Sequence, residues 1–69
     1  MTDIAVRLPI RLGQFLKLAN LAESGSHARE LIESGQVSVN NAVCTQRGKQ
    51  LDTGDRVSVH GETLTVASA

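Results

Sequence analysis

SGSHARELIESGQVSVNN, residues 24–41, contains the change of hydrophobic period that decides the fold. In its first half, Ala28, Leu31 and Ile32 follow the i, i+3, i+4 spacing of a buried helix face. Gly35 suits the left-handed position just past a helix end, where a side chain would be strained. The stretch therefore predicts a helix that ends immediately before Gly35.

The second half of the stretch has a period of two. Val37 and Val39 alternate with polar neighbours, which is typical of a half-buried strand. Asn40 and Asn41 follow as a turn signal, because asparagine tolerates positive φ. The apolar residues 42–44 then predict an antiparallel partner strand.

Another helix is predicted upstream, beginning at Leu12 and ending near Leu21 or Ala22. Four apolar residues share its buried face: Leu12, Phe15, Leu16 and Ala19. The second helix then begins at Ser24 or Ser26, since either hydroxyl can accept a hydrogen bond from a free amide of the first turn. Two short helices joined by a tight turn form a helix-turn-helix-like pair.

Downstream, residues 45–50 are polar and basic and are expected to form an exposed loop. Gly54-Asp55 and Gly61-Glu62 are turn signals on either side of an alternating strand at 56–60. A last strand is predicted at 63–66, with its alternate apolar residues facing inward.

Residues 1–9 are expected to form an N-terminal arm or an edge strand, because Pro9 lacks the amide that a central strand must donate. Residues 10–66 are expected to form a single domain, and 67–69 a tail. Helices followed by strands predict an α+β fold, in which the helix-turn-helix-like pair precedes a small, bent, mostly antiparallel sheet.

The charge balance argues against a generic polyanion binder. The chain has 69 residues, with 7 basic and 7 acidic side chains and a formal net charge of +0. Nucleic-acid binding would therefore require the two signs to be sorted onto different faces. Phe15 is the only aromatic residue, so base stacking is not expected to dominate.

Composition also bears on where the protein works. Residues 1–9 lack the charged start and long apolar stretch of a signal peptide, and no apolar run approaches membrane-spanning length. Cys44 is the single cysteine, so an internal disulfide is impossible and a reducing compartment fits. We expect a cytoplasmic monomer that has no contact with membranes.

No pattern of catalytic or metal-binding residues stands out. The two histidines, His27 and His60, and the one thiol, Cys44, lack the spacing of a zinc site. Cys44 with a histidine could in principle form a nucleophile, but a thiol that ends an apolar strand is typically packed and inert. Asp52 and Asp55 are explained by the turn that they flank. We therefore expect no enzyme activity, no catalytic or metal-binding residue and no cofactor.

The basic residues are the remaining candidates for a binding surface. They come from three segments that a compact fold can bring together, and they are Arg11, Lys17, Arg29, Arg47 and Lys49. Glu33 lies one turn after Arg29 and is expected to neutralise part of its charge. On composition alone, scattered charges that only solvate the surface are the simpler explanation.

Four segments in order resemble the S4-type RNA-binding domain, or alpha-L motif, which is named after a small-subunit ribosomal protein. Residues 11–17 (RLGQFLK) resemble its opening helix, and residues 24–32 (SGSHARELI) resemble its second helix with a serine start. Residues 35–40 (GQVSVN) are similar to the family's Gly-x-Val-x-Val-Asn-Gly, and residues 54–57 (GDRV) to its Gly-Asp-x-Val. Each segment is a weak signal alone, and their order makes the resemblance specific.

The best subgroup match is to short, single-domain bacterial proteins of the YbcJ/YaaA kind. These carry Leu-Gly-Gln-Phe-Leu-Lys early and a Thr-Arg-Arg-Gly loop later, whereas here the loop reads TQRGK at 45–49, so Gln46 replaces an arginine. Asn41, Ser26 and Arg29 stand where the pattern has Gly, Gly and Lys. These departures leave the expected fold intact and bear on the expected affinity.

The resemblance implies a small stand-alone protein that binds structured RNA, ribosomal or transfer RNA, through backbone and shape contacts, with the ribosome as a further partner. It implies that the helix pair and the adjoining strand turn contact the RNA, and that free amides at the start of the second helix hold a phosphate. The expected RNA-binding residues are Arg11, Lys17, Ser24, Ser26, Arg29, Asn40, Arg47 and Lys49.

Three other functions stay open at this point. Net neutrality favours a protein-interaction module that docks on a ribosomal or RNA-modifying partner. A sulfur carrier or ubiquitin-like protein would share Gly-Asp-x-Val but needs a terminal Gly-Gly, and the sequence ends in Ala67-Ser68-Ala69. An enzyme ranks last, because no candidate set of catalytic residues is present.

Overall fold

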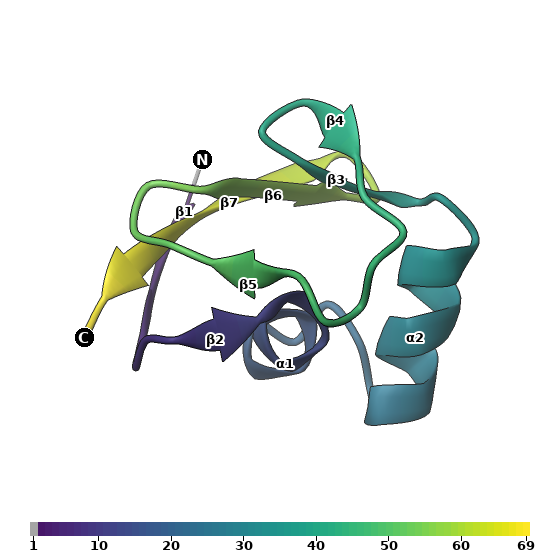
Figure 1. Ribbon diagram of the computed structural model, residues 1–69, viewed down its shortest axis with the longest axis horizontal. Helices are drawn as coiled ribbons and strands as arrows, with labels where there is room; N and C mark the ends of the chain where they lie inside the picture. The colour runs from purple at the N-terminus through teal and green to yellow at the C-terminus, as the bar shows by residue number, and fades with distance from the viewer. Residues whose placement is uncertain (1) are drawn as a thin grey trace.

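The computed structural model describes residues 2–69. A five-stranded sheet, in the order β1-β7-β6-β3-β4, packs over two short helices, and the pair β2–β5 lies beside the first helix (Figure 1). The elements are β1 Thr2–Val6, β2 Ile10–Arg11, α1 Leu12–Leu18, α2 Gly25–Glu33, β3 Val37–Val39, β4 Ala42–Val43, β5 Gln50–Leu51, β6 Arg56–Val59 and β7 Glu62–Ser68. Within the described chain, β1–β7 is the one parallel pair. The predicted α+β fold with a mostly antiparallel sheet is confirmed.

Both helices end in the same left-handed motif. The left-handed residue is Gly35 after α2, with φ of +78°, and Asn20 after α1, with φ of +60°. In each case the amide of that residue and the next amide donate to carbonyls of the last helical turn, which is the Schellman motif. The prediction at Gly35 is confirmed. The predicted end of α1 near Leu21 or Ala22 is wrong, because Asn20 leaves the helical conformation first.

Two hairpins use two-residue turns in which both central residues have positive φ, the geometry that suits the twist of paired strands. Asn40 and Asn41, with φ of 53° and 68°, join β3 to β4 as predicted. His60 and Gly61, with φ of 54° and 78°, join β6 to β7. The second turn therefore lies one residue earlier than predicted, and Glu62 already belongs to β7.

A single apolar core lies between the helices and the inner face of the sheet. Phe15 is completely buried, and in the part of the chain that the structure describes every buried residue is apolar. The helix faces and strand alternations predicted from the sequence are the surfaces that are buried: Leu12, Phe15 and Leu16 from α1, Ala28, Leu31 and Ile32 from α2, and Val37, Val39, Val57 and Val59 from β3 and β6.

β1 lies at one edge of the sheet and pairs in parallel with β7. Ala67 and Ser68 of β7 pair with Ala5 and Val6 of β1, and the Ala69 amide donates to the Val6 carbonyl at 2.9 Å. The predicted tail at 67–69 is therefore wrong for its first two residues, because pairing with β1 gives their backbone groups hydrogen-bond partners.

The loop between β4 and β5 folds back onto the start of α1. The Leu12 amide donates to the Lys49 carbonyl at 2.8 Å, and the Gly13 amide donates to the Arg47 carbonyl at 3.2 Å. The first amides of a helix have no partner inside the helix, so these carbonyls cap α1. Glycine at position 13 permits the approach, because a Cβ there would lie 3.3 Å from the Arg47 Cγ. Residues 45–50 are exposed, as predicted.

We predict that Gly35→Ala lowers the free energy of unfolding by about 1–2 kcal/mol, the cost of left-handed backbone for a residue with a Cβ. Space is not the cause, because the nearest atom to that Cβ would be the Val43 Cγ1 at 3.9 Å. Gly25→Ala is the matched control, since Gly25 lies in α2 and a Cβ there meets nothing within 4 Å. Urea unfolding measures both variants, and equal losses would contradict the assignment.

Candidate functional site

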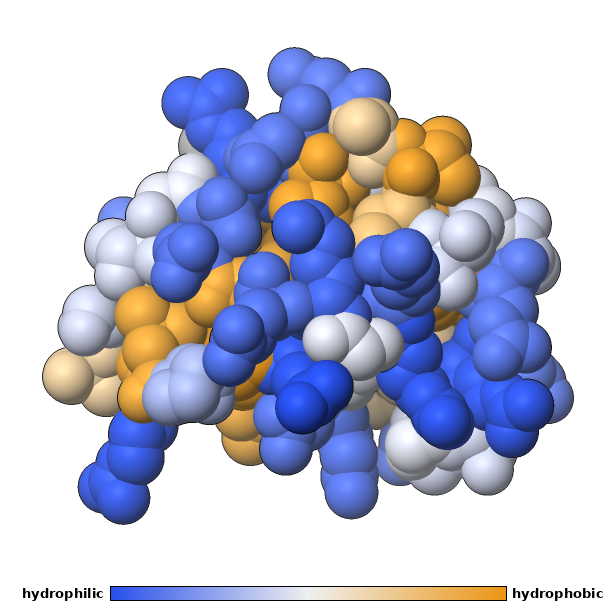
Figure 2. All heavy atoms as spheres, in the orientation of Figure 1, coloured by the Kyte–Doolittle hydropathy of each residue, from blue (hydrophilic) through white to orange (hydrophobic). Residues whose placement is uncertain are grey.

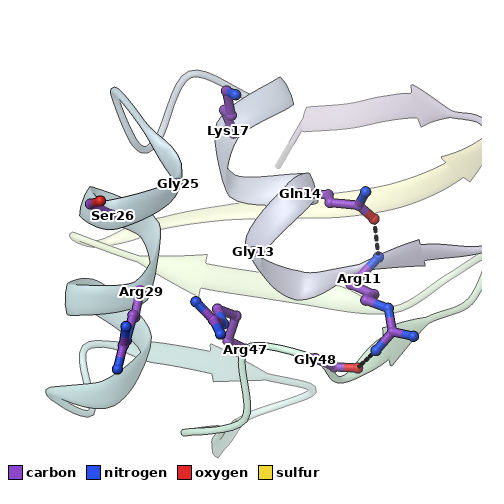
Figure 3. A pocket seen from close by; sticks show the side chains of 9 residues that line it. All are labelled: Arg11, Gly13, Gln14, Lys17, Gly25, Ser26, Arg29, Arg47 and Gly48. Carbon is purple, nitrogen blue, oxygen red and sulfur yellow. Dashed lines mark hydrogen bonds between the residues drawn. The ribbon is translucent and has the colours of Figure 1, made fainter.

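A cleft of about 760 Å³ opens between α1, α2 and the 45–49 loop (Figure 3). Its lining residues are Arg11, Gly13, Gln14, Lys17, Gly25, Ser26, Arg29, Arg47 and Gly48. Five of the eight residues that the sequence analysis nominated for RNA binding are among them: Arg11, Lys17, Ser26, Arg29 and Arg47. The fold thus brings three separate segments of the sequence to one surface.

Basic and acidic side chains are unevenly distributed around the cleft, although the chain as a whole has no net charge. Four of the 7 basic side chains line it, and none of the 7 acidic side chains does. In the space-filling view, hydrophilic side chains crowd the face over α1, α2 and the loop, while apolar atoms gather near β4 (Figure 2). Positive charge is therefore concentrated on this face although the formal net charge is +0.

Arg47 and Arg11 are positioned by the loop that caps α1. Arg47 lies between the two helices with its guanidinium turned toward α2 (Figure 3). Its carbonyl is held by the amide of Gly13, so the backbone anchors the residue and the side chain is left for binding. Arg11 donates from a guanidinium nitrogen to the Gly48 carbonyl at 3.3 Å, which ties the β2–α1 junction to the same loop.

Arg29 projects into the cleft from α2 and is partly neutralised, as expected. Its Nε donates to the Glu33 Oε2 at 2.9 Å, and the two side chains are 57% and 54% exposed. No hydrogen bond among residues 2–69 engages the two terminal nitrogens of Arg29. The residue therefore keeps a two-pronged donor for an anion, with its net charge reduced by the neighbouring carboxylate.

The start of α2 also faces the cleft. The Ser24 Oγ accepts the amide of His27 at 3.1 Å, so Ser24 rather than Ser26 is the N-cap. The next capping bond runs from the Ala28 amide to the Ser24 carbonyl. This leaves the amides of Gly25 and Ser26 without partners among the described residues, at the positively polarised end of the helix.

Three of the nominated residues are not among the lining residues: Ser24, which is the N-cap of α2, and Asn40 and Lys49, which lie elsewhere. Asn40 ties β3 to β6: its Nδ2 donates to the Asp55 Oδ1 at 3.2 Å, and its Oδ1 accepts the Arg56 amide at 3.0 Å. Both ends of its amide are thus occupied within the fold. Lys49 lines a separate hollow of about 320 Å³ beside the exposed Val43 of β4.

Sequence reasoning missed four lining residues, namely Gly13, Gln14, Gly25 and Gly48. Gly13 and Gln14 stood inside the quoted RLGQFLK motif without a role of their own. Gln14 accepts the amide of Arg11 on its Oε1 at 3.1 Å, which fixes the entry to α1. Gly48 permits close approach, since a Cβ there would lie 3.2 Å from an Arg11 nitrogen.

The histidines and the cysteine are accounted for by structural contacts. His27 accepts the Glu23 amide on its Nδ1 at 3.0 Å, and His60 forms one residue of the β6–β7 turn. Cys44 is half-buried and packs against the core. In residues 2–69 no three His, Cys, Asp or Glu side chains gather to hold a metal ion. No helix described here is long and apolar enough to cross a membrane.

Comparison with known proteins agrees with this geometry. The family model for the S4 domain matches residues 5–67. A relative from Bacillus subtilis (strain 168), the "Probable ribosome maturation protein RlbA", is 42% identical over 52 residues, which cover 75% of this chain and 73% of the relative.

The solution structure of YbcJ from E. coli superposes with a TM-score of 0.69 and 31% identity, covering 97% of this chain and 85% of that chain. That structure is described as revealing an alpha-L motif involved in RNA-binding. The resemblance predicted from four short motifs is therefore confirmed over nearly the whole chain, and the chain belongs to the S4 domain family.

Proposed function

We propose that this chain is a small RNA-binding protein that holds structured RNA by its phosphates in the cleft between α1, α2 and the loop. The observation that carries the proposal is the sorting of charge: Arg11, Lys17, Arg29 and Arg47 line the cleft, and no acidic residue is among its lining residues. Phosphate contacts supply most of the affinity of such proteins, and arginine matches phosphate geometry with paired donors.

The mode of recognition follows from what the surface lacks. Phe15, the one aromatic residue, is completely buried, so no aromatic side chain is available for bases to stack on. Backbone and shape contacts remain, and these are how folded RNA is mostly read. The free amides of Gly25 and Ser26 add donors for a phosphate at the start of α2.

The proposed partners are ribosomal or transfer RNA and the ribosome itself. The name of the Bacillus subtilis relative supports a role in ribosome maturation, which would place the protein in the cytoplasm. Within this proposal the chain binds RNA without a cofactor and carries out no catalytic step of its own.

The alternative is docking on a ribosomal or RNA-modifying protein. Net neutrality was its main support, and the concentration of positive charge in the cleft removes that argument. What still favours it is Val43, which is 65% exposed at the β4 edge of the sheet, next to Lys49. Association with a protein partner that is insensitive to salt would support this alternative over RNA binding.

We predict that Arg47→Ala and Arg29→Ala each weaken binding to ribosomal RNA fragments by about two- to fivefold, the value of an exposed charge pair. The slope of log affinity against log salt should become shallower by about 0.7–0.9 per contact removed. Arg56→Ala is the matched control, because Arg56 is exposed on β6 outside the cleft and carries the same charge.

Fluorescence anisotropy across a salt series measures these quantities. Equal losses for Arg56→Ala and the two cleft variants would show that only bulk charge matters. Absence of binding at low salt would overturn the proposed function itself.

We also predict that Glu33→Gln raises RNA affinity by about twofold at low salt, because it removes the carboxylate that pairs with Arg29. Glu30→Gln makes the same change in net charge on the same helix, one residue from Arg29 and without its ion pair. The gain should be clearly larger for Glu33→Gln, and equal gains would indicate a general charge effect. Thermal unfolding should change little, since exposed pairs contribute little to stability.

A further inference from the structure

Another hollow, of about 600 Å³ and distinct from the one that Lys49 lines, lies on α1 next to the cleft. Its walls come from the segment that joins β1 to β2, with Arg7 and Pro9, and from the C-terminal half of α1 and the turn after it. Gln14 and Lys17 line both the cleft and this hollow. They are one helical turn apart on the exposed face of α1, so the two depressions form one surface with α1 as the ridge between them.

The chemistry of the hollow differs from that of the cleft. Two cations, Arg7 and Lys17, stand around an apolar wall formed by Pro9, Ile10 and Leu18. Leu18 is 63% exposed. Among the described residues, Val43 is the one other large apolar side chain with comparable exposure, so an exposed leucine is unusual in this fold. No acidic residue lines the hollow. Counted with the cleft, five of the 7 basic residues of the chain lie along this surface.

An unpaired nucleotide fits this combination. The cations suit a phosphate, and the apolar wall suits the face of a base or a ribose. Bases inside a double helix are stacked and cannot offer their faces, whereas bases in loops and single strands can. The volume of about 600 Å³ falls in the range of about 300–1,000 Å³ that small-ligand pockets occupy.

We propose that the Arg7–Leu18 hollow holds an unpaired nucleotide that follows the structured RNA whose phosphates occupy the cleft. The protein then reads a junction between paired and single-stranded RNA, with Lys17 contacting the backbone where the two meet. This inference rests on the proposed function and adds the class of RNA that the surface selects. A bare duplex would engage the cleft alone.

The test compares three RNA probes: a short blunt duplex, and the same duplex extended by unpaired uridines on the 5′ or on the 3′ side. The unaltered protein should bind one of the extended duplexes about two- to fivefold more tightly than the blunt duplex, the scale of one exposed ion pair. Leu18→Gln, which keeps a good helix former, should abolish this gain without changing the salt slope. Arg7→Ala should reduce the gain and make the slope shallower by about 0.7.

Matched controls are available for both variants. Val43→Gln removes the other exposed apolar side chain, at 65% exposure, and Arg56→Ala removes an exposed arginine outside both depressions. Neither control should alter the preference for the extended duplex. All four positions are exposed, and unfolding midpoints close to that of the unaltered protein show that each variant is folded.

The outcomes separate this inference from the function on which it rests. No gain in affinity from either extension, with tight binding to the blunt duplex, overturns recognition of a junction and leaves RNA binding in place. If Leu18→Gln loses equal affinity for the blunt and the extended probes, the inference is also overturned, because the hollow would then contact paired RNA. Failure of all three probes to bind at low salt overturns the proposed function. A loss of affinity by Leu18→Gln that is confined to the extended probe supports recognition of a junction.

Discussion

The hydrogen bonds from the Leu12 and Gly13 amides to the carbonyls of Lys49 and Arg47 hold together the two sides of the cleft that α1 and the loop form. They give partners to amides that α1 cannot satisfy itself, and they keep the loop beside the helix where β2 pairs with β5. Without them the cleft would have the two helices as walls and no third side. Because backbone atoms make these bonds, the arginine side chain at position 47 takes no part in them.

Features that depend on neighbouring residues could be predicted from the sequence. The buried stripe of α2, the left-handed Gly35 and the Asn40–Asn41 turn all follow from periodicity or from the φ that a residue tolerates. The end of α1 could not, because Asn20 is a weaker signal than glycine for the same conformation. The strand at 67–68 was missed because these residues become a strand by pairing with β1, which lies more than sixty residues away in sequence.

The candidate site also has residues whose positions could be predicted from the sequence and residues whose contacts could not. The resemblance brought Arg11, Lys17, Arg29 and Arg47 together as expected neighbours, and the structure places them around one cleft. Asn40 is nominated as a binding residue, and nothing in its local sequence indicates that its side chain also bonds to a neighbouring strand, since an amide in a turn suits either role. Its bonds to Asp55 and Arg56 reach across the sheet, and no local pattern announces them. Net charge was uninformative for a related reason: it sums over faces that the fold keeps apart.

The parallel pairing of β1 with β7 has a consequence for how the protein is made. β1 is synthesised before its partners, Leu64 to Ser68, which lie more than sixty residues further along the sequence. The helices and the β3–β4 hairpin involve short sequence separations and can assemble earlier. Nascent chains therefore carry β1 as an unpaired strand until residues 64–68 have been synthesised and can reach it.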